Sequence, residues 1–243
     1  MALYAIGDLH LTFSSKRRME EFDDIWSDHE NKIKRAFEES IREEDTVVLT
    51  GDHTWGGHLS TCMKDLEWIC SLPGKKIMLR GNHDIFWQIK KTAGLQRQFG
   101  DRLFFLQGNF YPYGEYALIG SKGYCYEPWD KNPQAKNRAE KRYRVELARL
   151  KKGYESAREA GFNKFLIFLH YPPTEIESSG NSYGGYPDSC FTRFAREIGA
   201  KCLVYSHLHG RERFADSLRG EYGGVEYFLV SADYLEFKPF RLL

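Results

Sequence analysis

Thr46-Val47-Val48-Leu49-Thr50-Gly51-Asp52 is a short, β-branched and apolar run that stops at a glycine and an acidic residue. Such a run predicts a buried strand. Two other apolar runs end in a similar way: residues 3–6 precede Gly7-Asp8, and residues 76–80 precede Gly81-Asn82. Helical periodicity at 26–41 and 59–71 separates the three runs, so the first part of the chain predicts parallel strands joined by helices.

The rest of the chain adds helices and more closely spaced strands. A helix is expected after residue 84, ending by Gly94 or Gly100, and others at 134–160 and 191–198. Further strands are predicted at 103–106, 116–119, 164–169, 202–205, 225–230 and 236–242, with a turn around Tyr113-Gly114 and loops at 107–115 and 171–189. This order predicts a mixed α/β fold in which two mixed β-sheets stack and are flanked by helices, as a single domain over residues 1–243.

The composition gives no case for a nucleic-acid or membrane partner. Of 243 residues, 35 are Lys or Arg and 34 are Asp or Glu, so the formal net charge is +1. No apolar run approaches the roughly 18 residues of a spanning helix, and the N-terminal residues do not resemble a signal peptide. The five cysteines are odd in number and form no close pair, which favours a reduced, cytoplasmic protein.

Polar residues with metal-binding side chains follow several of the predicted strands. Because ligands bind beyond the carboxyl ends of strands in open α/β sheets, Asp8, Asp52, Asn82, His170 and His207 are expected at one rim. Imidazole, carboxylate and amide donors without cysteine suit an open site for Mn, Fe, Zn, Co or Ni rather than a closed structural zinc site.

Two cations about 3.5–4 Å apart need a bridging carboxylate, and together they activate a water. The expected chemistry is attack of a metal-bridging hydroxide on phosphorus, with the growing negative charge stabilised by both cations. A nearby histidine would protonate the leaving oxygen.

Five segments in order carry a family resemblance: Asp8-Leu9-His10, Gly51-Asp52, Gly81-Asn82-His83-Asp84, His170, and Ser206-His207-Leu208-His209. Their pattern resembles that of the calcineurin-like metallophosphoesterase superfamily, and the match extends from Asp8 to His209. The resemblance implies a four-layer sandwich of two sheets with a dinuclear site at the strand ends.

The same resemblance implies a role for each matching residue. Asp8, His10 and His209 would bind one metal, Asn82, His170 and His207 the other, and Asp52 would bridge them. His83 would contact phosphate and donate a proton to the leaving group. Asp84 matches the family's acidic position, where it would either orient His83 or cap the following helix. Manganese is the first expectation for both metals, with Fe, Zn, Ni or Co as alternatives.

The sequence departs from the family pattern at Ser206, where glycine is usual. Asp52 is followed by His53-Thr54-Trp55, without the acidic, Arg-containing extension of protein Ser/Thr phosphatases, and the chain has no room for the added domains of double-strand-break nucleases. The compact chain looks most like small bacterial predicted phosphohydrolases, so a small phosphomonoester or phosphodiester is the expected substrate. A metal-dependent nuclease and a non-catalytic scaffold are the alternatives, and nothing in the sequence indicates an oligomeric state.

Several other residues have two readings. His29 is expected on a solvated helix surface. His53, beside Asp52, would contact substrate or a carboxylate behind the metal ligands, or play a local structural role. His58, on a loop, would face the site or have no role in it. Arg80 would bind phosphate or pair with a carboxylate. Among the loop aromatics, Tyr124, Tyr126 and Trp129 would stack on a substrate or pack against the long helix, and Tyr183 and Tyr186 would form a lid.

Overall fold

A computed structural model describes the chain except for residues 14, 18, 125–132 and 175–188, and for residues 133–136 it describes the backbone alone. Contacts divide it into two compact units. The first unit joins Met1–Phe105 to Val230–Leu243, and the second comprises Leu106–Leu229. The single domain predicted over 1–243 therefore stays a prediction.

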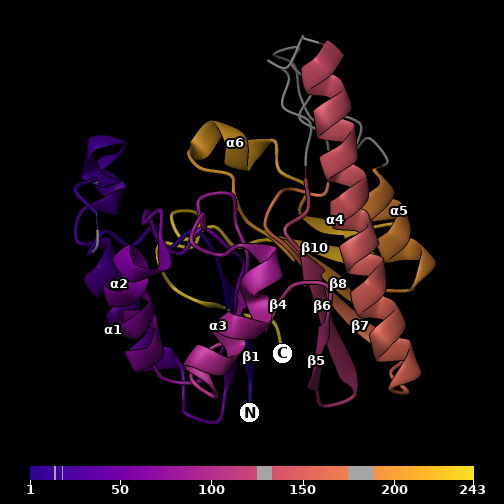
Figure 1. Ribbon diagram of the computed structural model, residues 1–243, viewed down its shortest axis with the longest axis horizontal. Helices are drawn as coiled ribbons and strands as arrows, with labels where there is room; N and C mark the ends of the chain where they lie inside the picture. Colours follow the sequence, from indigo (N-terminus) through magenta and orange to yellow (C-terminus); the bar gives the residue numbers. More distant parts are fainter. Residues whose placement is uncertain (14, 18, 125–132, 175–188) are drawn as a thin grey trace. The chain divides into compact units, whose positions relative to one another are not determined.

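The first unit contains a five-stranded sheet of order β11-β1-β2-β3-β4. Of its strands, β1 and β4 are labelled in Figure 1. Its strands are β1 (Leu3–Ile6), β2 (Thr46–Leu49), β3 (Lys75–Leu79), β4 (Phe104–Leu106) and β11 (Phe240–Arg241). The first three are parallel, as predicted, with Ile6 opposite Leu49 and Leu49 opposite Met78. β11 pairs antiparallel with the outer side of β1.

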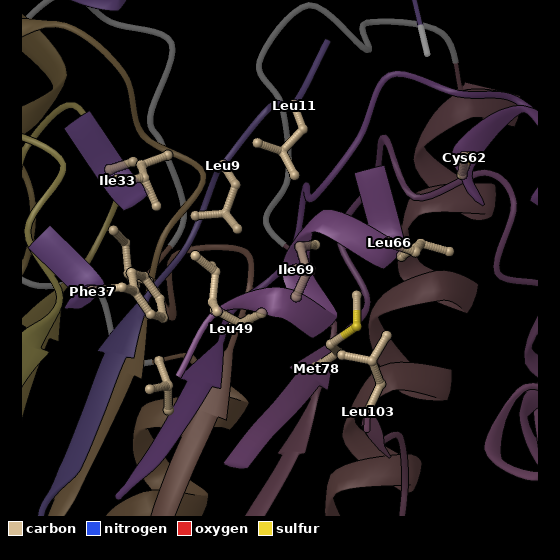
Figure 2. Packing of buried hydrophobic residues seen from close by; sticks show 14 of the residues in the cluster. Leu9, Leu11, Ile33, Phe37, Leu49, Cys62, Leu66, Ile69, Met78 and Leu103 are labelled. Atoms are coloured by element: carbon tan, nitrogen blue, oxygen red, sulfur yellow. The ribbon is translucent and has the colours of Figure 1, made fainter. Parts of the chain in front are cut away.

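Helices α1 (His29–Ser40), α2 (Leu59–Ser71) and α3 (Thr92–Phe99) belong to this unit, together with the short 3-10 helices η1 (Met19–Glu21), η2 (Asp24–Trp26) and η3 (Ile89–Lys91). Their apolar faces form one core with the strands. Figure 2 shows Ile33 and Phe37 from α1 and Ile69 from α2 gathered around Leu49 and Met78. This buried apolar surface holds the strand ends in place.

The second unit contains a six-stranded mixed sheet of order β5-β6-β7-β8-β10-β9. The strands are β5 (Phe110–Tyr113), β6 (Tyr116–Ser121), β7 (Lys164–Leu169), β8 (Cys202–Tyr205), β9 (Gly220–Tyr222) and β10 (Val225–Leu229). β6, β7, β8 and β10 are parallel, and the two edge strands pair antiparallel. Helices α4 (Pro133–Glu159) and α5 (Cys190–Glu197) pack together through Tyr154 and Phe194, and a short α6 (Arg211–Ala215) follows β8.

Two mixed sheets flanked by helices confirm the predicted fold class, whereas stacking of the sheets into four layers stays a prediction. Four elements differ from the sequence reading. β5 lies in the predicted loop 107–115, so the turn at Tyr113-Gly114 joins β5 to β6. β9 and α6 were not predicted. The predicted strand 236–242 is reduced to β11, because Glu236 and Phe237 adopt left-handed backbone conformations with φ of 50° and 63°.

The prediction that His29 is solvated is wrong. Its side chain is buried at the start of α1, where Nδ1 lies 3.0 Å from the Trp26 carbonyl and Nε2 lies 3.3 Å from the His10 carbonyl.

Within the described part of the chain, no helix is both long and apolar enough to cross a bilayer.

Candidate metal and phosphoester site

Six of the nine predicted site residues belong to the first unit, where they follow three aligned parallel strands. Asp8 and His10 come after β1, Asp52 after β2, and Asn82, His83 and Asp84 after β3. The backbones of the first two loops are joined directly: the Asp8 N–H donates to the Gly51 carbonyl (2.9 Å) and the His10 N–H to the Asp52 carbonyl (3.0 Å). The sheet therefore brings these loops to one edge, as predicted.

Four of the seven predicted metal ligands have a left-handed backbone. The φ angles are 56° at Asp8, 44° at His10, 53° at Asp52 and 75° at His207. Side chains with a Cβ disfavour this region, and residues held there concentrate at functional sites. Asp8, His10 and Asp52 are also almost fully buried, with exposures of 0%, 2% and 1%. The fold thus holds ionisable side chains in costly conformations away from water.

Gly81 is required by the close approach of Asp52 rather than by its own backbone conformation. A Cβ at Gly81 would overlap the carboxylate and backbone nitrogen of Asp52, and would lie 2.8 Å from its Cγ. The His83 N–H then donates to Asp52 Oδ1 at 2.7 Å. The third loop is therefore built around the Asp52 carboxylate.

Asp84 organises the turn that carries Asp52. Its fully buried carboxylate accepts N–H bonds from Gly81 (2.7 Å), Asp52 (2.9 Å) and His53 (2.9 Å), and His53 Nδ1 donates to Oδ2 at 2.9 Å. These contacts correspond neither to capping of a helix nor to a bond with the His83 side chain. The bond from His53 to Asp84 is the contact with a carboxylate behind the predicted ligands that the sequence offered as the alternative to a purely local structural role.

The pKa of the Asp84 carboxyl is below its usual value. Burial alone raises this pKa, but the adjacent His53 and the donated N–H groups lower it by more. Asp84 is therefore an anion at neutral pH and holds four donors at once, which fixes the conformation of the Gly51-Asp52-His53 turn.

His83 is more accessible than the buried carboxylates beside it. Its side chain is 38% exposed, and Nε2 lies 3.9 Å from Asp52 Oδ2. A half-exposed imidazole beside a buried carboxylate is suited to donate a proton to a bound ligand. Its placement is therefore compatible with the predicted role in proton transfer.

Trp55 is a site residue that the sequence reading missed. Its ring stacks on His10 with centroids 4.8 Å apart and lies 4.2 Å from the His83 ring. On the same ring, the Arg17 guanidinium carbon lies 4.2 Å from the centroid. An aromatic ring that packs on site residues cannot be recognised from a sequence motif of polar ligands, because only its contacts in the folded structure identify it.

Three of the predicted ligands lie in the second unit. His170 follows β7, and His207 and His209 follow β8. His207 Nδ1 and His170 Nε2 are 3.2 Å apart, and the His207 ring also lies 4.3 Å from the ring of Tyr171. Two imidazole nitrogens that face each other at this distance are compatible with ligation of a common cation.

Ser206, the departure from the family pattern, is tolerated within this unit. Its backbone N–H donates to the His170 carbonyl (3.1 Å), and its Oγ lies 3.3 Å from His170 Nδ1. The serine therefore supports the ring of a predicted ligand instead of disturbing the loop.

Other expectations have mixed outcomes. Arg80 Nε is buried and finds no acceptor among the described residues, so the expected carboxylate partner is not seen there. Tyr124 packs against Tyr171, at 5.6 Å between ring centroids. Tyr126, Trp129, Tyr183 and Tyr186 lie outside the described residues.

Comparison with known proteins agrees with the pattern of residues. The family described as calcineurin-like phosphoesterase matches residues 1–211. A structure of phosphopantetheinyl hydrolase (PptH) from Mycobacterium tuberculosis is 15% identical, with 100% of this chain and 95% of that chain covered and a TM-score of 0.61. The protein TT1561 of Thermus thermophilus is 11% identical, covering 86% and 82% of the two chains, with a TM-score of 0.51. At such identities the likeness concerns the fold.

A curated relative, the Gene 66 protein of Mycobacterium phage D29, is 31% identical over 78 residues, which are 32% of this chain. The chain spans 38% of that relative's length. The family match covers most of the chain and includes all nine predicted site residues. This chain belongs to the calcineurin-like phosphoesterase family.

Proposed function

We propose that the protein is a dinuclear metal-dependent phosphoesterase that hydrolyses a small phosphomonoester or phosphodiester. Asp8, His10 and His209 would bind one metal ion. Asn82, His170 and His207 would bind the other, and Asp52 would bridge the two. Manganese is the first candidate, and Fe, Zn, Ni and Co are the alternatives that the same donors accept.

The observation that carries the proposal is the backbone conformation of the predicted ligands. Asp8, His10, Asp52 and His207 all have positive φ. Glycine, which adopts positive φ without cost, directly precedes Asp8 and Asp52 but does not replace them. A left-handed conformation at a residue with a Cβ costs on the order of 1 kcal/mol. Such residues persist where their side chains are needed, as at a metal site.

The donor chemistry of the first unit fits hard or borderline cations. Asp8 and Asp52 supply buried carboxylates, and His10 supplies a buried imidazole. Buried anions are costly unless a cation or hydrogen bonds compensate them, and a divalent cation does so most strongly. When bound, the two cations would polarise the phosphoryl oxygens and make a water nucleophilic at neutral pH.

The chain's own residues would orient the reaction and move the proton. His83 would donate a proton to the leaving oxygen, since it is half-exposed and lies beside Asp52. Trp55 would limit the rotation of His83, because its ring packs against the imidazole in a tilted arrangement at 4.2 Å between centroids. Asp84 would act through Asp52, whose backbone N–H it accepts, and is therefore a positioning residue.

A small phosphate ester is the proposed substrate. The near-zero net charge gives no support to a nucleic-acid substrate.

A reducing, cytoplasmic location belongs to the same proposal. In support, Cys62, Cys70, Cys190 and Cys202, the cysteines among the described residues, are all free thiols.

The test combines metal analysis with a substrate panel. Protein purified without chelator is expected to hold about two metal ions per chain, and to release phosphate or alcohol from aryl monoesters or aryl diesters when Mn²⁺ is added. Asp52→Ala is expected to abolish both metal retention and turnover. His83→Gln should keep the metals and lower kcat by about 10²–10⁴-fold, the usual cost of losing a general acid.

A scaffold protein would give a different result: less than one metal per chain and no hydrolysis of any ester in the panel. Collapse of the metal content in His83→Gln would instead show that His83 is a ligand rather than the proton donor. Exposed Lys64→Met is the matched surface control, expected to change neither metal content nor kcat.

A further inference from the structure

The first unit contains a cavity that no step of the proposed chemistry uses. Its volume is about 490 Å³, within the range of about 300–1,000 Å³ typical of small-molecule pockets. It lies between the first turn of α2, at His58 and Leu59, and the segment formed by η3 and α3. One wall begins at Ile85, the residue after His83-Asp84.

The lining combines an apolar surface with three cations. Leu59, Phe86 and Leu95 supply apolar side chains, and the 60% exposed side chain of Ile85 also lines the cavity. Lys90 and Lys91 from η3 and Arg97 from α3 also line the cavity. None of the described residues that line it is acidic. The pocket therefore carries a formal charge of about +3 over an apolar wall.

The three cations are available to a ligand. Lys90, Lys91 and Arg97 are exposed, and none of them forms a salt bridge with a described residue. Elsewhere on the same unit, Arg102 is paired with Glu67 at 2.5 Å. Unpaired cations above an apolar surface are complementary to a ligand that has both an apolar body and an anionic end.

We propose that this cavity binds the leaving group of the substrate: an alcohol with an apolar arm that ends in a second anionic group, phosphate or carboxylate. This inference rests on the proposed function, in which His83 donates a proton to the leaving oxygen. Ile85, which lines the cavity, follows His83 by two residues, and its N–H donates to the His83 carbonyl at 2.7 Å, so the cavity wall begins at the loop that carries the proposed proton donor.

Paired substrates test the distal charge. Hexyl phosphate and hexanediol bisphosphate share an aliphatic arm and differ in the second phosphate. If the substrate panel identifies a diesterase, their methyl diesters replace them. The kcat/KM of the bisphosphate is expected to be at least about tenfold higher than that of hexyl phosphate, which corresponds to the free energy of one or two exposed ion pairs. The difference should shrink at high salt.

Variants locate the effect. Lys91→Met and Arg97→Met should each lower the preference for the bisphosphate about fivefold, with little change for hexyl phosphate. Lys64→Met removes an exposed cation from α2 outside the cavity and should leave the preference unchanged. Gly94 also lines the cavity, and a Cβ there would meet no atom within 4 Å. Gly94→Phe, with its Tm measured alongside that of the wild type, should raise the KM of hexyl phosphate but not of methyl phosphate.

A binding measurement separates this inference from the proposed function. Metal-free protein titrated with hexanediol monophosphate in a calorimeter should bind it, and Lys91→Met should weaken the binding about fivefold. Absence of hydrolysis with this binding intact would refute the proposed function and keep the pocket as an anion site. Equal kcat/KM for the two paired substrates, or the same loss in Lys64→Met as in Lys91→Met, would overturn the inference.

Discussion

The packing of Gly81 against Asp52 leads to a quantitative prediction for Gly81→Ala. The added methyl would overlap Asp52 Oδ1 and the Asp52 backbone nitrogen, and would sit 2.8 Å from Cγ. A flexible side chain could turn away, but the backbone nitrogen cannot, because it donates to Asp84 at 2.9 Å. The loop that carries Asp52 must therefore shift.

The cost follows from the contacts that such a shift disturbs. Overpacking a filled site costs about 1–3 kcal/mol. The displacement also strains hydrogen bonds to charged groups, each worth about 1.5–3 kcal/mol, including the one from His83 to Asp52 (2.7 Å). A loss of about 3 kcal/mol in the free energy of unfolding is expected, with a fall in Tm of roughly 6–12 °C. The variant still folds, but its metal content should drop.

Urea denaturation and elemental analysis of the purified variant measure both effects. Gly94→Ala is the matched control, since its new Cβ meets no atom within 4 Å. Within α3 that change should stabilise the protein by up to about 1 kcal/mol and leave the metal content unchanged. If Gly81→Ala kept the wild-type stability and metal content, the close approach of Asp52 would not be what requires glycine at this position.

Three further perturbations probe other features. The Asp45 carboxylate accepts an N–H bond from Ala2, and this bond lowers the pKa of Asp45 in the folded protein. The contribution of Asp45 to stability is therefore complete above the unfolded pKa of about 4. It is lost as the pH falls through the lower folded pKa. Asp45→Asn should cost on the order of 1 kcal/mol at neutral pH, and urea titrations should show the deficit shrinking below about pH 4. Trp55→Leu removes the plate beside His83, so kcat should fall about tenfold or more with the metal content retained; an unchanged kcat would mean that the stacking positions nothing. Burial raises the pKa of Cys202 to about 12, so peptide mapping after thiol labelling at neutral pH should find it unmodified until the protein unfolds.

Strands buried on both faces were readable from the sequence, whereas edge strands were not. β2 and β7 are continuous apolar runs, which is the pattern of a buried parallel strand. β5 contains Pro112 and lies at the edge of its sheet, where proline is tolerated but alternation is weak. β9 begins with Gly220 and is largely exposed, so neither propensity nor periodicity indicates it.

The identities of the candidate ligands were predictable, but the interactions that hold them were not. Asp8, Asp52 and His207 stand directly after apolar runs, so their placement follows from strand direction. That Asp84 would bind the Asp52-His53 turn depends on four donors meeting at one carboxylate. Burial of His29 was missed because its neighbours in sequence are charged, while its ring is held by two backbone carbonyls as well as by the adjacent Glu30 (3.2 Å).

The C-terminal strand has a consequence for how the protein is made. Val230 and Ala232 hydrogen-bond Gly7 on both sides, at 2.8 and 3.0 Å, and β11 covers the open side of β1. During translation, β1 and the adjoining Asp8 are synthesised well before Val230, Ala232 and β11, their later neighbours in the sheet. Until then β1 is an unprotected edge, exposed to pairing with other nascent chains. Deletion of β11 (Phe240–Arg241) should therefore lower the yield of native protein more than a comparable deletion in a surface loop.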